Sequence, residues 1–214
     1  MGASPLTGRI IRNADDVAEG AAWLASQEPR FAALLPSLSP LPLRLKPDGF
    51  GPLVHAIMGQ QVSVASANAI WARLEAEGLT NAPAMAAMSQ DDLRTLGLSR
   101  QKASYVHALA AAEIDFELLR STPTDQVLKT LTSVSGIGAW TAEVYAMFSL
   151  GRADVFAPGD LALQEGARMI FDLPERPKDK DLRDMAKAWA PWRSVAARII
   201  WAYYGAMKKR DGLI

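Results

Sequence analysis

The chain has 214 residues, half of them hydrophobic, and its 23 Lys and Arg balance 23 Asp and Glu, so the formal net charge is zero. This balance argues against a protein that coats nucleic acid by charge alone. The absence of cysteine excludes a disulfide scaffold, a zinc knuckle and a cysteine-held iron–sulfur cluster. No apolar run reaches membrane-spanning length and residues 1–10 lack the pattern of a signal peptide. We therefore expect a cytoplasmic protein with no membrane partner.

Hydrophobic residues recur at helical spacing along most of the chain, and no segment alternates with period two for long enough to predict a strand. Asn13, followed by two acidic residues, predicts a helix start. A second short helix contains Phe31, and Pro36 predicts its end. The segment from Pro36 to Pro47 contains four prolines, which predict an extended connector.

Apolar helical patterns continue downstream, several of them preceded by a capping serine, aspartate or proline. The predicted helices cover residues 49–58, 64–77, 89–96, 99–109, 123–131, 140–148, 160–170, 182–189 and 192–207. The composition and the spacing together predict an all-α protein.

Residues 131–140, LTSVSGIGAW, join two of these helices through a short glycine-containing turn. Gly136 and Gly138 can both adopt positive φ without steric cost, so two helices can meet in a hairpin of a few residues. Glycine also allows a phosphate to approach the backbone, and the N–H groups that begin the second helix then face it. The pattern predicts sequence-independent binding of a nucleic-acid backbone.

Four motifs occur in order along the chain: GQQVS at 59–63, GIGAWTA at 136–142, VFAPGD at 155–160 and PWRSVA at 191–196. Together they resemble the helix-hairpin-helix DNA glycosylases, in particular the 3-methyladenine DNA glycosylase II branch. The resemblance covers about residues 50–205 and implies an all-α, two-lobed fold with a central cleft. It implies that residues 1–50 pack with the C-terminal lobe, that 51–150 form the hairpin lobe, and that 151–214 carry the catalytic loop and complete the other lobe.

The resemblance also implies a function in base excision repair. The expected enzyme is a monomer that flips alkylated purines, 3-methyladenine and related bases, out of double-stranded DNA. It hydrolyses the N-glycosidic bond and leaves an abasic site. Two alternatives stay open: a non-catalytic helix-hairpin-helix module that only docks on DNA, and a glycosylase for another class of lesion.

Asp160 is the expected catalytic residue. From the residues alone, Pro-Gly-Asp before an apolar helix is equally a capping arrangement, because the carboxylate accepts hydrogen bonds from free helix N–H groups. The resemblance places the aspartate at this step past the hairpin beneath the extruded sugar, and both roles are compatible. A carboxylate there stabilises the electron-poor sugar of the transition state and positions or deprotonates water.

Two tryptophans are expected to bind the substrate base. Trp140 occupies the position at which relatives that also cleave the DNA backbone carry a Schiff-base lysine, which implies a monofunctional enzyme. Its indole offers a π face to a cationic base, and Trp201 resembles a second pocket aromatic. Each could instead be a core residue. The sequence departs from the family at Val144 and Leu161, where better-known members have tyrosine-like pocket residues.

The expected DNA contacts lie in two places. Gln60 and Gln61 occupy the loop that enters the minor groove in the family, where one of them could fill the gap left by the flipped nucleotide. The alternative is that these amides cap their loop. The hairpin contributes the remaining contacts, which are Gly136, Ile137, Gly138 and Thr141.

No cofactor is expected to be required. In the family, the hairpin carbonyls at the positions of Thr132, Val134 and Ile137 can hold a monovalent cation, Na⁺ or K⁺, that bridges to phosphate. Backbone oxygens leave no side-chain signature, so this site is a hypothesis from the resemblance alone.

Overall fold

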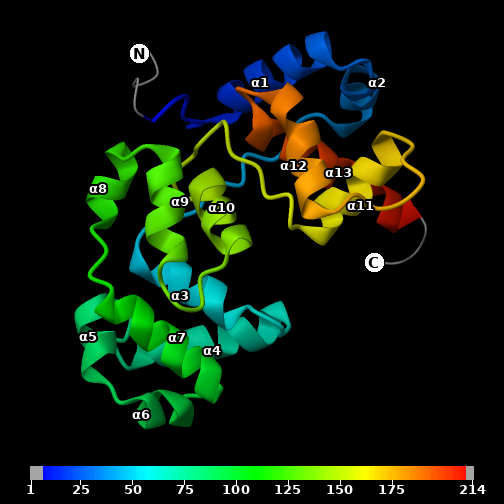
Figure 1. Ribbon diagram of the computed structural model, residues 1–214. Helices are drawn as coiled ribbons and strands as arrows, with labels where there is room; N and C mark the ends of the chain where they lie inside the picture. The colour runs from blue at the N-terminus through cyan, green and yellow to red at the C-terminus, as the bar shows by residue number, and fades with distance from the viewer. Residues whose placement is uncertain (1–6, 211–214) are drawn as a thin grey trace. The chain divides into compact units, whose positions relative to one another are not determined.

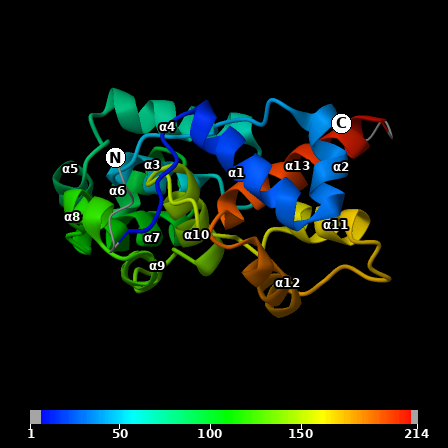
Figure 2. The same cartoon turned by 90° about the horizontal axis from the view of Figure 1, so that it is seen from above.

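The computed structural model describes residues 7–210, and the chain divides into two units. Unit 1 comprises Met1–Leu45 and Ala146–Ile214, and unit 2 comprises Lys46–Tyr145. The chain therefore passes from one unit to the other twice. Figure 1 and Figure 2 show the helices of each unit along the colour gradient.

Unit 1 is built around its last helix. All residues from Ser194 to Ile200 in this helix are fully buried, and the helix contacts α1, α2, η1 and α11. The described helices of unit 1 are α1 (Ala14–Gln27), α2 (Pro29–Leu38), α11 (Leu161–Ile170), α12 (Asp179–Met185), the 3-10 helix η1 (Ala186–Trp189) and α13 (Arg193–Arg210). Buried apolar side chains from the two segments of unit 1, which precede and follow unit 2 in the sequence, thus form one core.

Unit 2 packs around α7, which contacts α3, α5 and α6. Its described helices are α3 (Phe50–Met58), α4 (Val64–Ala76), α5 (Ala82–Ala87), α6 (Gln90–Thr95), α7 (Arg100–Ala111), α8 (Phe116–Ser121), α9 (Thr124–Thr132) and α10 (Ala139–Phe148), the last running past Tyr145 into unit 1. Lys102 on α7 donates to the carbonyl of Met58 at the end of α3, over 2.6 Å, and burial lowers the pKa of this lysine.

The all-α prediction is confirmed. Across residues 7–210 the backbone forms helices and turns with no named strand, and an isolated antiparallel bridge pairs Ile10 with Arg152. Helix starts follow the predicted caps: Asn13 and Asp16 form a capping box, and Ser63, Ser89 and Ser99 each accept a hydrogen bond from the first turn. Across this same range, no helix is long and apolar enough to cross a membrane.

Some predicted helix boundaries were wrong. α2 continues through Pro36 to Leu38, because a proline near the end of a helix removes only one hydrogen bond and Ser39 still donates to Leu35. The expected helix over 182–189 is α12 followed by η1. Two further helices, α5 and α8, were not predicted, because six residues are too few to show a helical period.

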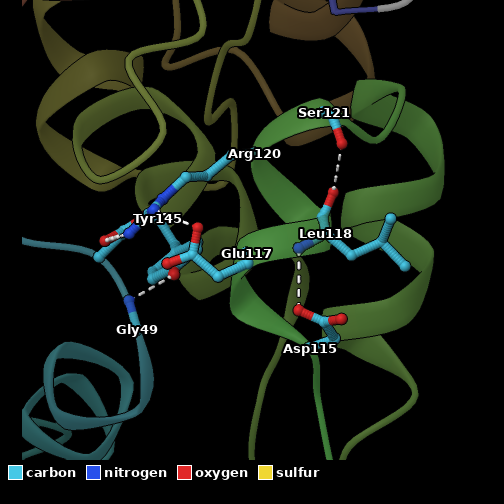
Figure 3. A network of polar contacts seen from close by, with 8 residues as sticks. Gly49, Asp115, Glu117, Leu118, Arg120, Ser121 and Tyr145 are labelled. Atoms are coloured by element: carbon cyan, nitrogen blue, oxygen red, sulfur yellow. Dashed lines mark hydrogen bonds and ion pairs between the residues drawn. The ribbon is translucent and has the colours of Figure 1, made fainter.

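A polar network in unit 2 joins the start of that unit to its end (Figure 3). The Tyr145 hydroxyl on α10 accepts from the backbone N–H of Gly49 over 2.8 Å. Next to it, Arg120 on α8 donates to both carboxylate oxygens of Asp48, over 2.6 and 3.0 Å, and to Glu117. The hydrogen bond and charge of Arg120 lower the pKa of Asp48 despite its partial burial. Residues near the two ends of unit 2, where the chain enters and leaves this unit, thus belong to one hydrogen-bonded cluster.

Replacing Tyr145 by Phe tests this cluster. The ring stays and the acceptor for Gly49 is lost, so we expect a loss of about 1 kcal/mol, which lowers Tm by roughly 2–4 °C. Burial raises the pKa of Tyr145 from 10.0 to about 12, so the folded state favours the neutral phenol. The wild type should therefore lose stability as the pH rises from 10 to about 12, and its advantage over Tyr145→Phe should shrink in that window. A constant difference across this window, in thermal or denaturant unfolding, would contradict the assignment.

Candidate active site

Asp160 lies at the start of α11 and caps it. Its Oδ1 accepts hydrogen bonds from the backbone N–H groups of Ala162, over 2.9 Å, and Leu163, over 3.0 Å. The capping alternative is therefore correct as a description of the local structure. A third donor reaches the same oxygen: the indole Nε1 of Trp201, on α13, at 3.0 Å. Capping does not need this third bond, so the carboxylate is also linked to a predicted pocket aromatic.

The loop before Asp160 is held firmly, although it has no regular structure. Val155, Phe156 and Ala157 are buried, and the Phe156 ring packs against Trp189 with a 5.3 Å centroid separation. The buried amide of Gln164 donates to the Pro158 carbonyl over 2.8 Å. These contacts fix the position of Asp160 through packing on both sides.

Asp154 serves this loop in a different way. Arg193, the first residue of α13, forms two hydrogen bonds with the Asp154 carboxylate, at 2.6 and 2.8 Å, and both side chains are about one-third exposed. This bidentate geometry is the strong form of an arginine–carboxylate pair. The neighbouring Ser194 N–H donates to the Ala153 carbonyl over 2.9 Å. Arg193 and Ser194 of the PWRS motif thus anchor the loop before Asp160 to the start of α13.

Trp201 is partly buried, and its ring has aromatic and cationic neighbours. The Phe148 ring lies 5.6 Å away at a tilt of 35°, and the guanidinium carbon of Arg44 lies 5.5 Å above the indole. Arg44 comes from the proline-rich connector and was not among the predicted site residues. No motif marks it, because the contact depends on how the connector folds back over α13.

The hairpin in unit 2 uses its two glycines differently. Gly136 has a φ of 92°, and a Cβ there would lie 2.3 Å from Cγ of Tyr105, so this position needs glycine for conformation and for space. Gly138 is absent from the left-handed residues, and a Cβ there would meet no atom within 4 Å. Of the two glycines that can take positive φ, Gly136 does so and Gly138 does not, and the open surface at Gly138 leaves room for a ligand.

The other hairpin residues are placed as follows. Ile137 and Thr141 are buried, so any contact with a ligand would use their backbone groups. The Ile137 N–H donates to the Val134 carbonyl over 3.1 Å, and the Thr132 hydroxyl donates to the Leu128 carbonyl over 2.7 Å. Trp140, in the first turn of α10, has 43% of its surface exposed, which argues against a core role within unit 2.

The glutamine loop is bonded to the hairpin. The Gln60 side chain donates to the Gly136 carbonyl over 3.0 Å, so the structure brings together two sites that are 76 residues apart. Gln61 is exposed and has a φ of 59°, a left-handed conformation that is uncommon outside glycine and asparagine. Gln60 thus connects the glutamine loop to the hairpin within unit 2, whereas Gln61 is exposed to solvent in the turn.

Known proteins share the sequence pattern and the fold of this chain. The family model for HhH-GPD superfamily base excision DNA repair proteins matches residues 54–191, which include the hairpin, the aspartate loop and the start of the PWRS motif. The chain belongs to this superfamily. A crystal structure of DNA-3-methyladenine glycosidase from Bacillus halodurans is 32% identical, with a TM-score of 0.78 over 89% of this chain and 91% of that one.

Two proteins of Schizosaccharomyces pombe are also similar. The 3-methyladenine DNA glycosylase Mag1, solved in complex with abasic DNA, is 26% identical, with a TM-score of 0.74 over 86% of this chain and 95% of that one. The alkylbase DNA glycosidase-like protein mag2 is 25% identical over 190 residues, which cover 83% of this chain and 89% of the relative. The helix-hairpin-helix glycosylase fold inferred from the motifs is confirmed.

The two hairpin glycines give a matched pair of substitutions. Gly136→Ala combines left-handed strain with a clash against Tyr105, so we expect a loss of about 2–4 kcal/mol. Gly138→Ala adds a methyl group to open space and should change stability by less than about 0.5 kcal/mol. Denaturant unfolding measures both, and equal effects would contradict the different roles assigned to the two glycines.

Proposed function

We propose that this chain is a monofunctional DNA glycosylase that hydrolyses the N-glycosidic bond of alkylated purines, 3-methyladenine among them, in base excision repair. Its partner is double-stranded DNA that contains a damaged base, and its product is an abasic site. We further propose that it acts as a monomer in the cytoplasm, on the chromosome. The names of the similar proteins support the substrate class, since they include 3-methyladenine glycosylases.

The observation that carries the proposal is the set of three hydrogen bonds to Oδ1 of Asp160. Two come from the start of a helix, where the backbone favours negative charge, and one comes from Trp201. A carboxylate held by fixed donors does not need to reorganise when positive charge develops near it. As the glycosidic bond breaks, the deoxyribose becomes electron-poor, and Asp160 would stabilise it and position the attacking water.

The leaving group needs little help. An N-alkylated purine nucleoside already carries a positive charge, so the base departs as a neutral molecule without a strong general acid. Trp140 presents an exposed indole at the start of α10, which suits stacking on such a cationic base, an interaction worth about 0.5–2 kcal/mol. An indole in place of an amine provides no Schiff base, which supports cleavage of the glycosidic bond alone.

DNA backbone binding would use the hairpin. The open surface of Gly138 leaves room for a phosphate beside the first N–H groups of α10, where the side chains of Ile137 and Thr141 do not intervene. The carbonyls of Thr132, Val134 and Ile137 remain our proposal for a Na⁺ or K⁺ site at this turn. The Val134 carbonyl accepts one hydrogen bond from Ile137 and keeps a second lone pair for such an ion.

The charge of Asp160 can be removed with little change in shape. An asparagine there keeps an oxygen that accepts the same three hydrogen bonds, so Asp160→Asn should fold and bind DNA as the wild type does. We expect base release from methylated duplex DNA to fall by about 10²–10³-fold under single-turnover conditions, with free bases identified by mass. The matched control is Asp115→Asn, which removes the charge of another helix-capping carboxylate, the one that accepts from the Leu118 N–H at the start of α8, and should leave release within a few-fold. Base release by Asp160→Asn at the parental rate would refute the catalytic role of Asp160. A wild type that binds DNA but releases no base would instead favour the DNA-docking alternative.

Substitutions can also distinguish the roles of the two glutamines. We propose that Gln61 enters the duplex beside the flipped nucleotide and that Gln60 supports the hairpin. Gln61→Ala should lower the single-turnover rate roughly tenfold with little change in Tm, because extrusion of a base costs a few kcal/mol that a wedge helps to offset. Gln60→Ala should lower Tm by roughly 2–4 °C through the lost bond to Gly136. A Gln61→Ala enzyme with full activity on duplex DNA would contradict this division.

A further inference from the structure

Arg44 is held in an uncommon backbone conformation beside the candidate active site. Its φ is 57°, in the left-handed region, and the carbonyl of the preceding residue, Leu43, accepts hydrogen bonds from Nε and Nη2 of Arg198, over 3.2 and 2.8 Å. This pins the peptide before Arg44 and places its guanidinium carbon 5.5 Å above the Trp201 ring. Trp201 in turn donates to Asp160.

Arg198 is a cation with no exposed surface. Its other hydrogen bonds go to the carbonyl and hydroxyl of Ser194, at 2.9 and 3.0 Å, and its guanidinium carbon lies 5.0 Å from the centre of the Phe148 ring. All of these acceptors are neutral. Burial and the nearby charge of Arg44 lower the pKa of Arg198 to about 10, the direction expected when two like charges are held close together.

The chain thus keeps two guanidinium groups close together without a carboxylate between them. Within residues 7–210, no aspartate or glutamate forms an ion pair with Arg44 or Arg198, and the Arg44 side chain is exposed. Left-handed strain at Arg44 adds to the cost of this arrangement. An anion that binds Arg44 would offset both costs, whereas a cationic base would increase the repulsion.

We propose that Arg44 binds a backbone phosphate of the DNA, next to the nucleotide on which Asp160 acts. A guanidinium that lies over an aromatic ring keeps donors at its rim for the oxygens of a phosphate. In a chain with no net charge, local cations of this kind supply the phosphate contacts. This contact is separate from the hairpin and lies in unit 1, and it rests on the DNA glycosylase function proposed above.

The test measures equilibrium binding to a duplex that carries a neutral tetrahydrofuran abasic analogue, over a range of KCl concentrations. Arg44→Met should weaken binding about tenfold at low salt and reduce the slope of log K against log[salt] by about 1, the amount expected for one phosphate contact. Arg44→Lys keeps the charge and should keep the slope. The matched control is Arg30→Met, because Arg30 also lies over an aromatic ring, Phe171 at 5.2 Å, but already pairs with Glu28.

A constant inactive fraction shifts log K equally at every salt concentration and leaves the slope unchanged, and unfolding of each variant across the same KCl range checks that this fraction is constant. An unchanged slope in Arg44→Met, or an equal decrease in Arg30→Met, would overturn the proposal. Free inorganic phosphate that competes with DNA for the wild type and for Arg44→Met alike would also count against it. Release of 3-methyladenine by the wild type, measured separately, tests the proposed function itself, and its failure would leave the salt slopes as an independent result.

Discussion

A single carboxylate oxygen joins the elements that matter most in unit 1. The Oδ1 atom of Asp160 accepts from the first turn of α11 and from the indole of Trp201 on α13. The loop that leads to Asp160 is held by a buried aromatic contact and by the Asp154–Arg193 pair. If the carboxylate were free to rotate, water and solvent dipoles would have to reorganise as charge develops, and most of the electrostatic benefit would be lost. The rigid surroundings of this residue therefore belong to its proposed chemistry.

The proposed contacts with DNA also depend on a few local groups rather than on the overall charge. The chain has no formal net charge, so its overall charge supplies no long-range attraction to DNA. Its proposed phosphate contacts are instead local and of two kinds. The hairpin offers backbone N–H groups beside Gly138, and the connector offers Arg44, which is kept in place by a buried arginine and an aromatic ring. Both sites are built from backbone geometry more than from the number of cations.

Much of the fold could be predicted because helix starts depend on local chemistry. Asn13, Ser63 and Ser99 are capping residues followed by apolar helical patterns, and each begins a helix in the structure. The prediction failed at Pro36, since a proline in the last turn leaves later carbonyl acceptors in use, and at α5 and α8, which are too short for a period to appear. A sequence shows which residues cap a helix, but it does not show whether the helix tolerates the hydrogen bond that is lost at a proline.

The site was readable in part for a related reason. Motifs predicted Asp160, Trp201 and the glycine hairpin as site residues, since these residues lie at fixed steps along the chain, and the structure joins the first two by a hydrogen bond. Motifs could not distinguish Gly136 from Gly138, because only the packing of Tyr105 shows which of them lacks room for a side chain. Nor could they reveal Arg44 over Trp201, or the bond from Gln60 to the Gly136 carbonyl, because both depend on segments distant in sequence.

The most direct test of the role of Asp160 compares two abasic analogues in otherwise identical duplexes. A pyrrolidine analogue carries a positive charge that mimics the electron-poor sugar of the transition state, and a tetrahydrofuran analogue is its neutral counterpart. If the carboxylate stabilises that charge, the wild type will bind the pyrrolidine duplex more tightly than the tetrahydrofuran duplex, and Asp160→Asn will lose this preference while it binds the neutral duplex normally. An equal preference in both proteins would show that the charge of Asp160 does not act on the sugar.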